Sequence, residues 1–147
     1  MLITSTKQIE KVNKMSRTVE QITLDKMYAA FAEQNVEAAV ETVSDDSVWI
    51  HHGTQKLPSL RFEGKAGVHQ FFQANFTTLK VEYFDILNTY QQGNTIIVTG
   101  KEKFIKVEDG SILAQKWVQI YTFENGLITR MEEFASSAAD EDYIVIS

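Results

Sequence analysis

The sequence predicts an α+β domain in which helices pack on one face of a curved, mainly antiparallel sheet. Apolar residues recur with a helical period in the first half of the chain and alternate with polar residues in the second half. The turn signals QGN, EDGS and ENG separate the alternating segments. Helices grouped first and a meander of strands afterwards are typical of α+β domains.

Two helices are expected first along the chain. Thr18 can cap a helix that continues to about Gln34, and Gln21, three residues after Thr18, completes a capping-box pattern. Asn35 then indicates the start of a second, shorter helix over residues 36–43. In each segment the apolar residues gather on one side: Val19, Ile22, Met27, Ala30 and Phe31 in the first, and Val36, Ala39, Val40 and Val43 in the second.

A strand, a loop, a third helix and a meander are expected to follow. SVWIHH at 47–52 has the pattern of a strand, and residues 53–64, with the only proline of the chain, have that of a loop. A helix is expected from about Lys65 to Leu79, with an apolar stripe that includes Val68 and Phe72. The alternating pattern then predicts four strands, over 81–90, 95–107, 112–123 and 127–134.

Composition limits the functions that this chain can perform. Its 147 residues, 44% of them apolar, have the length of one ordinary domain with a real hydrophobic core. The net charge of −6 and the lack of a basic run argue against nucleic acid as a partner. The absence of cysteine suits the cytoplasm, and no apolar block predicts a signal peptide or a membrane span. No phosphate-binding loop, dinucleotide fingerprint or histidine metal pattern occurs, so neither a cofactor nor a metal is expected.

The adjacent residues His51 and His52 end the first predicted strand. Neighbouring residues of a strand point to opposite faces, so at most one of the two histidines can face a given site. His51 shares its face with Trp49, whereas His52 shares the face of Val48 and Ile50.

The turns of the meander predict which strand faces meet. A two-residue turn at 109–110 sets Gly100 opposite Gln119. The face that carries Trp117, Gln119 and Tyr121 then combines large aromatic rings with an empty space beside an amide. Such a face is either the wall of a cavity or an aromatic core stripe, and both interpretations stay open.

The next turn decides which of two adjacent glutamates shares that face. A three-residue loop at 124–126 sets Gln119 opposite Met131 and turns Glu133 to this side. A two-residue loop at 125–126 slips the register by one residue and turns Glu132 there instead. In a third interpretation both glutamates are solvated near a sheet edge, because carboxylates are seldom buried without a partner.

Four short motifs carry a resemblance to a known family: N-V-E-A-A-V at 35–40, D-D-S-V at 45–48, F-E-G-K at 62–65 and Y-T-F-E-N-G-L-I at 121–128. Their order and spacing resemble those of the nuclear transport factor 2-like superfamily, also called cystatin-like, and especially its SnoaL-like polyketide cyclases and ketosteroid isomerases. The resemblance implies a domain over 18–135, between an N-terminal extension, 1–17, and a C-terminal tail or extra strand, 136–147. It also implies a cone-shaped sheet around an internal cavity, and a homodimer formed through the outer sheet face.

The resemblance to ketosteroid isomerases can be followed residue by residue. Their general-base aspartate falls on His51, their oxyanion tyrosine on Met27, and their oxyanion aspartic acid on Gln119. All three identities differ, so steroid isomerisation by that mechanism is not expected. The SnoaL-like cyclases, which use a histidine and an acid in the cavity, resemble this chain better. That resemblance implies the three-residue loop and a working pair formed by His51 and Glu133.

Two hypotheses of function follow. In the first, the protein is a cofactor-free isomerase, cyclase or dehydratase in which His51 is the general base on a carbon acid and Glu133 orients it. Gln119, helped by Tyr28, would stabilise the enolate oxygen. In the second, the protein only binds a hydrophobic small molecule, or is a dimeric structural protein of this fold. In either function the residues expected to contact a ligand are Trp49, Tyr28, Met27, Phe72, Trp117, Tyr121 and Met131.

Overall fold

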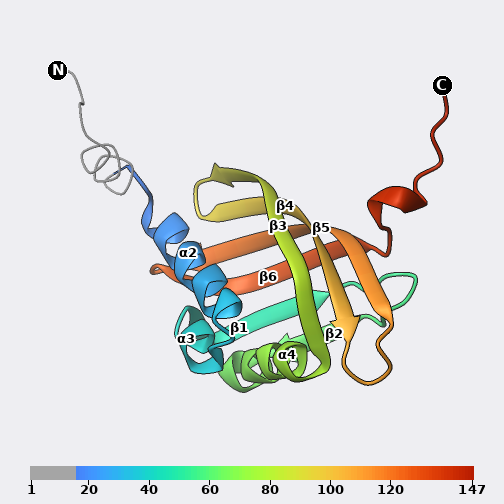
Figure 1. Ribbon diagram of the computed structural model, residues 1–147. Helices are drawn as coiled ribbons and strands as arrows, with labels where there is room; N and C mark the ends of the chain where they lie inside the picture. The colour runs from blue at the N-terminus through green and yellow to red at the C-terminus, as the bar shows by residue number, and fades with distance from the viewer. Residues whose placement is uncertain (1–15) are drawn as a thin grey trace, which may run out of the picture.

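The computed structural model describes residues 16–147, so nearly all of the expected N-terminal extension lies outside the described residues. Three helices of this part of the chain, α2 (Val19–Ala32), α3 (Val36–Val40) and α4 (Gly64–Thr78), pack on a six-stranded sheet that does not close. The strands are β1 (Val43–His51), β2 (Leu60–Glu63), β3 (Leu79–Gln92), β4 (Thr95–Lys106), β5 (Ile112–Glu124) and β6 (Leu127–Ser136). The predicted α+β class is confirmed (Figure 1).

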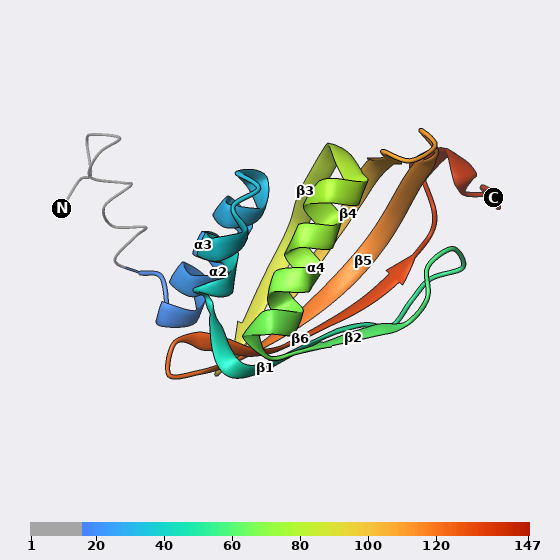
Figure 2. The same cartoon turned by 90° about the horizontal axis from the view of Figure 1, so that it is seen from below.

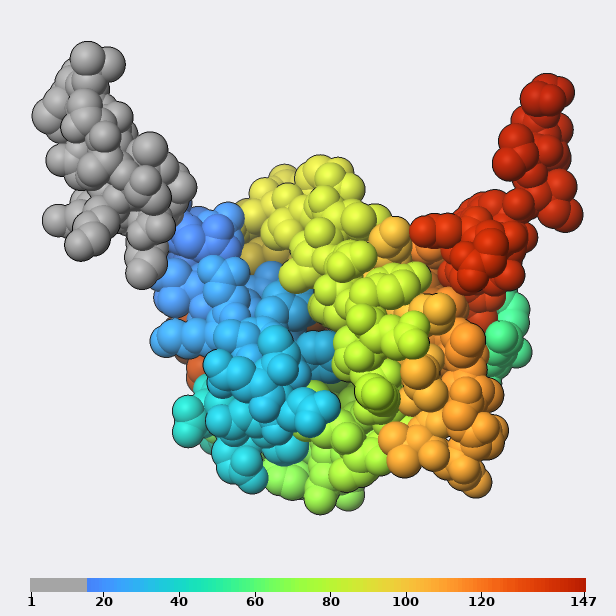
Figure 3. Space-filling view, viewed as in Figure 1, coloured from blue at the N-terminus to red at the C-terminus, as the bar shows by residue number. Residues whose placement is uncertain are grey.

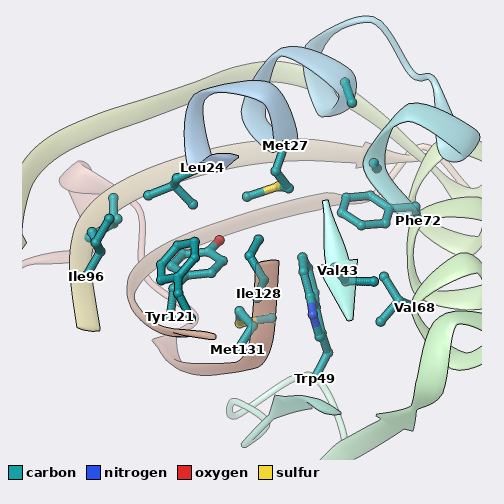
Figure 4. Close-up of a cluster of buried hydrophobic side chains, with 14 of the residues drawn as sticks. Leu24, Met27, Val43, Trp49, Val68, Phe72, Ile96, Tyr121, Ile128 and Met131 are labelled. Atoms are coloured by element: carbon teal, nitrogen blue, oxygen red, sulfur yellow. The ribbon is translucent and has the colours of Figure 1, made fainter. Parts of the chain in front are cut away.

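The order of strands in the sheet is β2-β1-β6-β5-β4-β3. Strands β1 and β6 run parallel, while the other neighbouring pairs are antiparallel. The sheet curves, and Figure 2 shows α4 lying within its concave side. Buried apolar side chains from the helices and from this concave face form one core cluster (Figure 4).

Local sequence explains where the helices begin. Thr18 caps α2 in the predicted capping box, since Thr18 and Gln21 each accept the other's backbone N–H through a side-chain oxygen. Asn35 caps α3 by accepting the N–H of Ala38. Helix α3 ends at Val40 rather than at Val43, because Val43 already begins β1. The segment 53–64, expected as a loop, contains the short strand β2 on the edge of the sheet.

The connection between β4 and β5 differs from the predicted two-residue turn. It spans residues 107–111, and the N–H of Lys106 donates to the carbonyl of Ser111 across it. The register is therefore displaced by two residues, and Gly100 lies opposite Trp117 instead of Gln119. A displacement of two residues keeps every side chain on its face, because the side-chain period of a strand is two.

The connection between β5 and β6 combines parts of both predicted alternatives. The turn itself has two residues, Asn125 and Gly126, with φ angles of 51° and 76°. A β-bulge then leaves Thr129 out of the residue-to-residue pairing with β5, although its hydroxyl donates to the carbonyl of Thr122, and displaces the register by one residue. Because of the bulge, Glu133 and not Glu132 lies opposite Gln119. The expected three-residue loop is wrong, although Glu133 does lie on the concave face.

The C-terminal residues leave the sheet after β6. A short 3-10 helix, η1 (Asp140–Asp142), is held to the sheet by ion pairs of Asp140 with Lys101 and Lys116. The YIVI segment forms no strand, and Figure 3 shows the end of the chain projecting from the body of the protein. None of the helices within residues 16–147 is long and apolar enough to cross a membrane.

Candidate active site

A cavity of about 190 Å³ lies between helices α2 and α4 and the concave face of the sheet. Its volume is below the roughly 300 Å³ at which typical ligand pockets begin, so it suits a small molecule. Most of its wall is apolar or aromatic, with a few polar side chains from β1, β4, β5 and β6. Six of the seven predicted contact residues line it: Trp49, Tyr28, Met27, Phe72, Tyr121 and Met131 (Figure 4 labels all of these but Tyr28).

Trp117 is the exception, because it is not among the residues that line the cavity. Its ring is stacked on Phe84, with centroids 5.1 Å apart, and it lies over Gly100. The space that Gly100 leaves is thus occupied by the indole and is not an empty gap beside Gln119. Trp117 does not line the cavity and instead supports Phe84, which does.

The parallel pairing of β1 with β6 brings His51 beside Glu133. Nε2 of His51 lies 2.8 Å from Oε2 of Glu133, and only 11% and 8% of the two side chains are exposed. Both residues line the cavity. A histidine and a carboxylate in contact within a largely apolar cavity form a pair that can take up and return a proton.

The other ring nitrogen of His51 determines where its proton resides. The backbone N–H of Gly53 donates to Nδ1 over 2.9 Å. Because a backbone N–H can only donate, Nδ1 carries no proton and the neutral ring keeps its proton on Nε2. His51 therefore donates to Glu133, and the carboxylate is the proton acceptor of the pair. Gly53 has a φ of 87°, and a Cβ there would lie 2.9 Å from the carbonyl oxygen of Leu57, so this arrangement requires glycine.

Gln119 joins Glu133 to two tyrosines. Its Nε2 donates to Oε1 of Glu133 over 2.5 Å, and its Oε1 accepts the hydroxyls of Tyr28, at 2.7 Å, and Tyr121, at 2.5 Å. Burial raises the pKa of both tyrosine hydroxyls, which keeps them protonated as donors. The two tyrosines thus donate to Gln119, and Gln119 donates to Glu133, which is the final acceptor of the network.

The second histidine forms a similar pair on the outer face of the sheet. His52 Nε2 lies 2.6 Å from Oε1 of Glu132, and the ring of His52 is stacked on Phe134 at 4.3 Å between centroids. This pair is substantially exposed, at 39% and 24% of the side chains, and it is not part of the cavity lining. Within residues 16–147 no group of three or more His, Asp or Glu side chains is arranged to hold a metal ion.

The cavity wall contains a second polar pair, Glu102 and Gln115, that was not predicted from the sequence. Glu102 on β4 lies opposite Gln115 on β5, whose Nε2 donates to Oε2 of Glu102 over 2.7 Å. Both residues line the cavity and are buried. The alternation Gln115, Trp117, Gln119 along β5 already placed Gln115 on the inner face. Its pairing with Glu102 was not predicted, because the expected register of β4 and β5 differs from the observed one by two residues.

Comparison with known proteins agrees with this architecture. The sequence matches the SnoaL-like domain family over residues 24–131, and the chain therefore belongs to that family. No curated protein matches the sequence.

Solved structures show the same fold. An NTF2-like protein from Burkholderia xenovorans LB400 matches with a TM-score of 0.73 and 18% identity, covering 84% of this chain and 93% of the other. TerC, crystallised with polyporic acid, matches with a TM-score of 0.65 and 21% identity over 80% and 91% of the two chains. A candidate SnoaL-like polyketide cyclase from Mesorhizobium loti matches with a TM-score of 0.61 and 20% identity over 80% and 99%. At these identities the likeness extends to the fold alone.

Proposed function

We propose that this protein is a cofactor-free enzyme that moves a proton on a small, largely apolar carbon acid, as an isomerase, cyclase or dehydratase does. One observation carries the proposal: the buried contact between His51 and Glu133 inside the cavity. Membership of the SnoaL-like family and the fold shared with a candidate polyketide cyclase support it.

The hydrogen bonds favour Glu133 as the base, in place of the role first expected for His51. A carboxylate has about four lone-pair sites, and the donors His51 and Gln119 occupy two of them. The remaining sites can accept a proton from a carbon beside a carbonyl group. The resulting enolate oxygen would be stabilised by an N–H donor, for which the second amide hydrogen of Gln119 is available.

Proton return completes the reaction. Glu133 can return the proton to another carbon, which shifts a double bond, or the enolate can attack a carbonyl carbon within the same molecule, which closes a ring. Loss of a hydroxyl from the neighbouring carbon, with the proton, gives a dehydration. The three outcomes share the first step, so that step is the one to measure.

Deuterium exchange into 2-tetralone, a small bicyclic ketone with acidic C–H groups, tests the proposal. The wild-type protein should accelerate exchange at C1 in D₂O, followed by proton NMR. Glu133→Gln should lower this acceleration about 10²- to 10⁴-fold, the usual contribution of a general base. The matched control is Glu132→Gln, which alters the corresponding carboxylate on the outer face and should leave the rate unchanged.

The non-catalytic alternative has a distinct signature. The mostly apolar wall of the cavity would also suit a protein that only binds a hydrophobic molecule. Binding of 2-tetralone without any acceleration of exchange, or equal rates for Glu133→Gln and Glu132→Gln, would favour this alternative over catalysis.

A homodimer through the outer sheet face is also proposed. Tyr90, Ile97 and Phe134 expose 58%, 37% and 47% of their surface. Ile97 and Phe134 lie at outward positions of β4 and β6, each preceded by a buried residue. Sedimentation of the wild type as a dimer, and of Phe134→Arg as a monomer, would support this interface. A wild-type monomer would contradict it.

A further inference from the structure

The Glu102 and Gln115 pair has no role in the proton transfer proposed above, yet it is buried in the wall of the same cavity. Oε1 of Gln115 is buried and has no hydrogen-bond partner among the described residues. Buried polar atoms nearly always have a partner, so an orphan in a cavity wall indicates a group that a ligand satisfies. We propose that Glu102 and Gln115 form a second polar anchor, which binds a hydroxyl group at the end of the ligand remote from Glu133.

The atoms of the pair select the kind of group that fits. Oε2 of Glu102 accepts the amide of Gln115, which leaves Oε1 of Glu102 to carry the proton when the acid is neutral. Burial raises the pKa of Glu102 well above its usual range, and the negative charge of Glu133 raises it further, although the bond from Gln115 lowers it. The neutral acid thus offers a donor beside the free acceptor of Gln115.

A hydroxyl group satisfies both atoms at once, since it accepts from Glu102 and donates to Gln115. A carbonyl group would use only the donor, and would leave Oε1 of Gln115 unpaired. A cation would require ionised Glu102, against both its burial and the charge of Glu133.

Strand geometry gives the spacing between the two anchors. Gln115 and Gln119 lie four residues apart on β5, on the same face, which corresponds to about 13 Å of strand. The wall between them includes the ring of Phe84, supported by Trp117. The ligand class that fits is a flat, apolar molecule that carries its reactive carbon near Glu133 and a hydroxyl at the other end.

This inference rests on the proposed function only in that the cavity takes a small molecule. Binding is therefore measured by titration calorimetry, without turnover, using 2-naphthol and naphthalene as probes. Failure of catalysis in the 2-tetralone experiment leaves the binding result unaffected. The wild type should bind 2-naphthol about tenfold more tightly than naphthalene, and Gln115→Met, of similar length but without the amide, should lose most of this preference.

The matched control is Glu132→Gln, which alters a carboxylate on the outer face of the sheet, away from the cavity lining, and should keep the preference. If Glu133→Gln loses it while Gln115→Met keeps it, the hydroxyl binds beside Glu133 and the proposal is overturned. Equal affinities of the wild type for the two probes, or no binding of either, also overturn it. Tighter binding of the cation of 1-(aminomethyl)naphthalene than of 2-naphthol would show that Glu102 acts as a carboxylate, against the proposal. Circular dichroism of each variant establishes that it is folded.

Discussion

His51 and His52 are neighbours in the chain, yet each pairs with a different glutamate on opposite faces of the same sheet. The parallel register of β1 and β6 sets Ile50 beside Glu132 and His51 beside Glu133. The two histidines therefore form one buried pair, with Glu133, and one exposed pair, with Glu132. The two pairs contain the same residue types. They therefore form a natural matched set for separating the effect of burial from that of residue type.

The first prediction compares the loss of each histidine. His51→Ala removes a donor from buried Glu133 and should lower the free energy of unfolding by about 3 kcal/mol, as expected when one partner of a buried pair is lost. His52→Ala removes an exposed pair and should cost less than about 1 kcal/mol. Urea denaturation measures both. Similar losses for the two variants would contradict the difference in burial.

The second prediction concerns the proton of His51. The bond from the N–H of Gly53 to Nδ1 requires the neutral tautomer with its proton on Nε2. Two-bond ¹H–¹⁵N NMR spectra at a pH where the imidazole is neutral should show Nδ1 as the unprotonated nitrogen. A protonated Nδ1 would return the role of proton acceptor to Nε2 of His51, and would remove the argument for Glu133 as the base.

The third prediction tests the close approach of Trp117 to Gly100. A Cβ at position 100 would lie 2.2 Å from Cζ2 of the indole and 2.6 Å from the backbone oxygen of Asp85. Overpacking of this kind costs typically 1–3 kcal/mol, and we expect Gly100→Ala to lie near the upper end. The control is Gly93→Ala, because no atom lies within 4 Å of a Cβ built there. Gly93 has a φ of 58°, so its own cost is confined to backbone strain.

The fourth prediction follows from the raised pKa of Glu102. The folded-state pKa lies above the unfolded value of about 4.3, so the folded protein binds this proton more tightly. The resulting stability is fully present below about pH 4.3 and is lost as the pH rises toward the folded pKa, by at most about 1.4 kcal/mol per pH unit.

Urea denaturation at a series of pH values checks this direction. Glu102→Gln cannot ionise, so its free energy of unfolding should rise relative to that of the wild type as the pH increases. Glu124→Gln, at an exposed position, serves as the control for effects of net charge. A constant difference between Glu102→Gln and the wild type across the series would argue against a shifted pKa.

The fifth prediction asks whether the fold needs the Glu102 and Gln115 pair. Replacing both members of a buried polar pair by apolar side chains of similar volume is often neutral or stabilising. The double variant Glu102→Leu, Gln115→Leu should therefore unfold at the same or a higher urea concentration than the wild type. A loss of more than about 2 kcal/mol would indicate that the pair is structural, and would weaken its assignment as a ligand anchor.

Local features of the fold could be predicted from the sequence. The capping box of Thr18 and Gln21 defines the start of α2 through contacts within one turn, and the alternation of side chains along β5 gives its inner face. The alternation of side chains along a strand also places His51 on the face of Trp49. These inferences depend only on residues close together in the chain.

Features that depend on loop conformation could not be predicted in the same way. The sequence DG favours a two-residue turn, but the loop in the structure is longer. Every observed pairing between β4 and β5 therefore differs by two residues from the predicted one. The partners of Gly100 and Glu102 were therefore misplaced. The proton on His51 was also missed, since it depends on the backbone of Gly53 in a loop with no repeating pattern.

The bulge at Thr129 determines which of the two adjacent glutamates of β6 faces the cavity. Two carboxylates stand side by side in the chain, and the single extra residue in β6 selects which one faces inward. A relative with the same number of residues between the turn and the glutamates, but without the bulge, would turn the other acid toward its cavity. A relative that lacks both the extra residue and the bulge would keep the same acid there. Matching dipeptides between sequences is therefore insufficient for assigning this site, and both the spacing from Gly126 to Glu133 and the presence of the bulge must be compared as well.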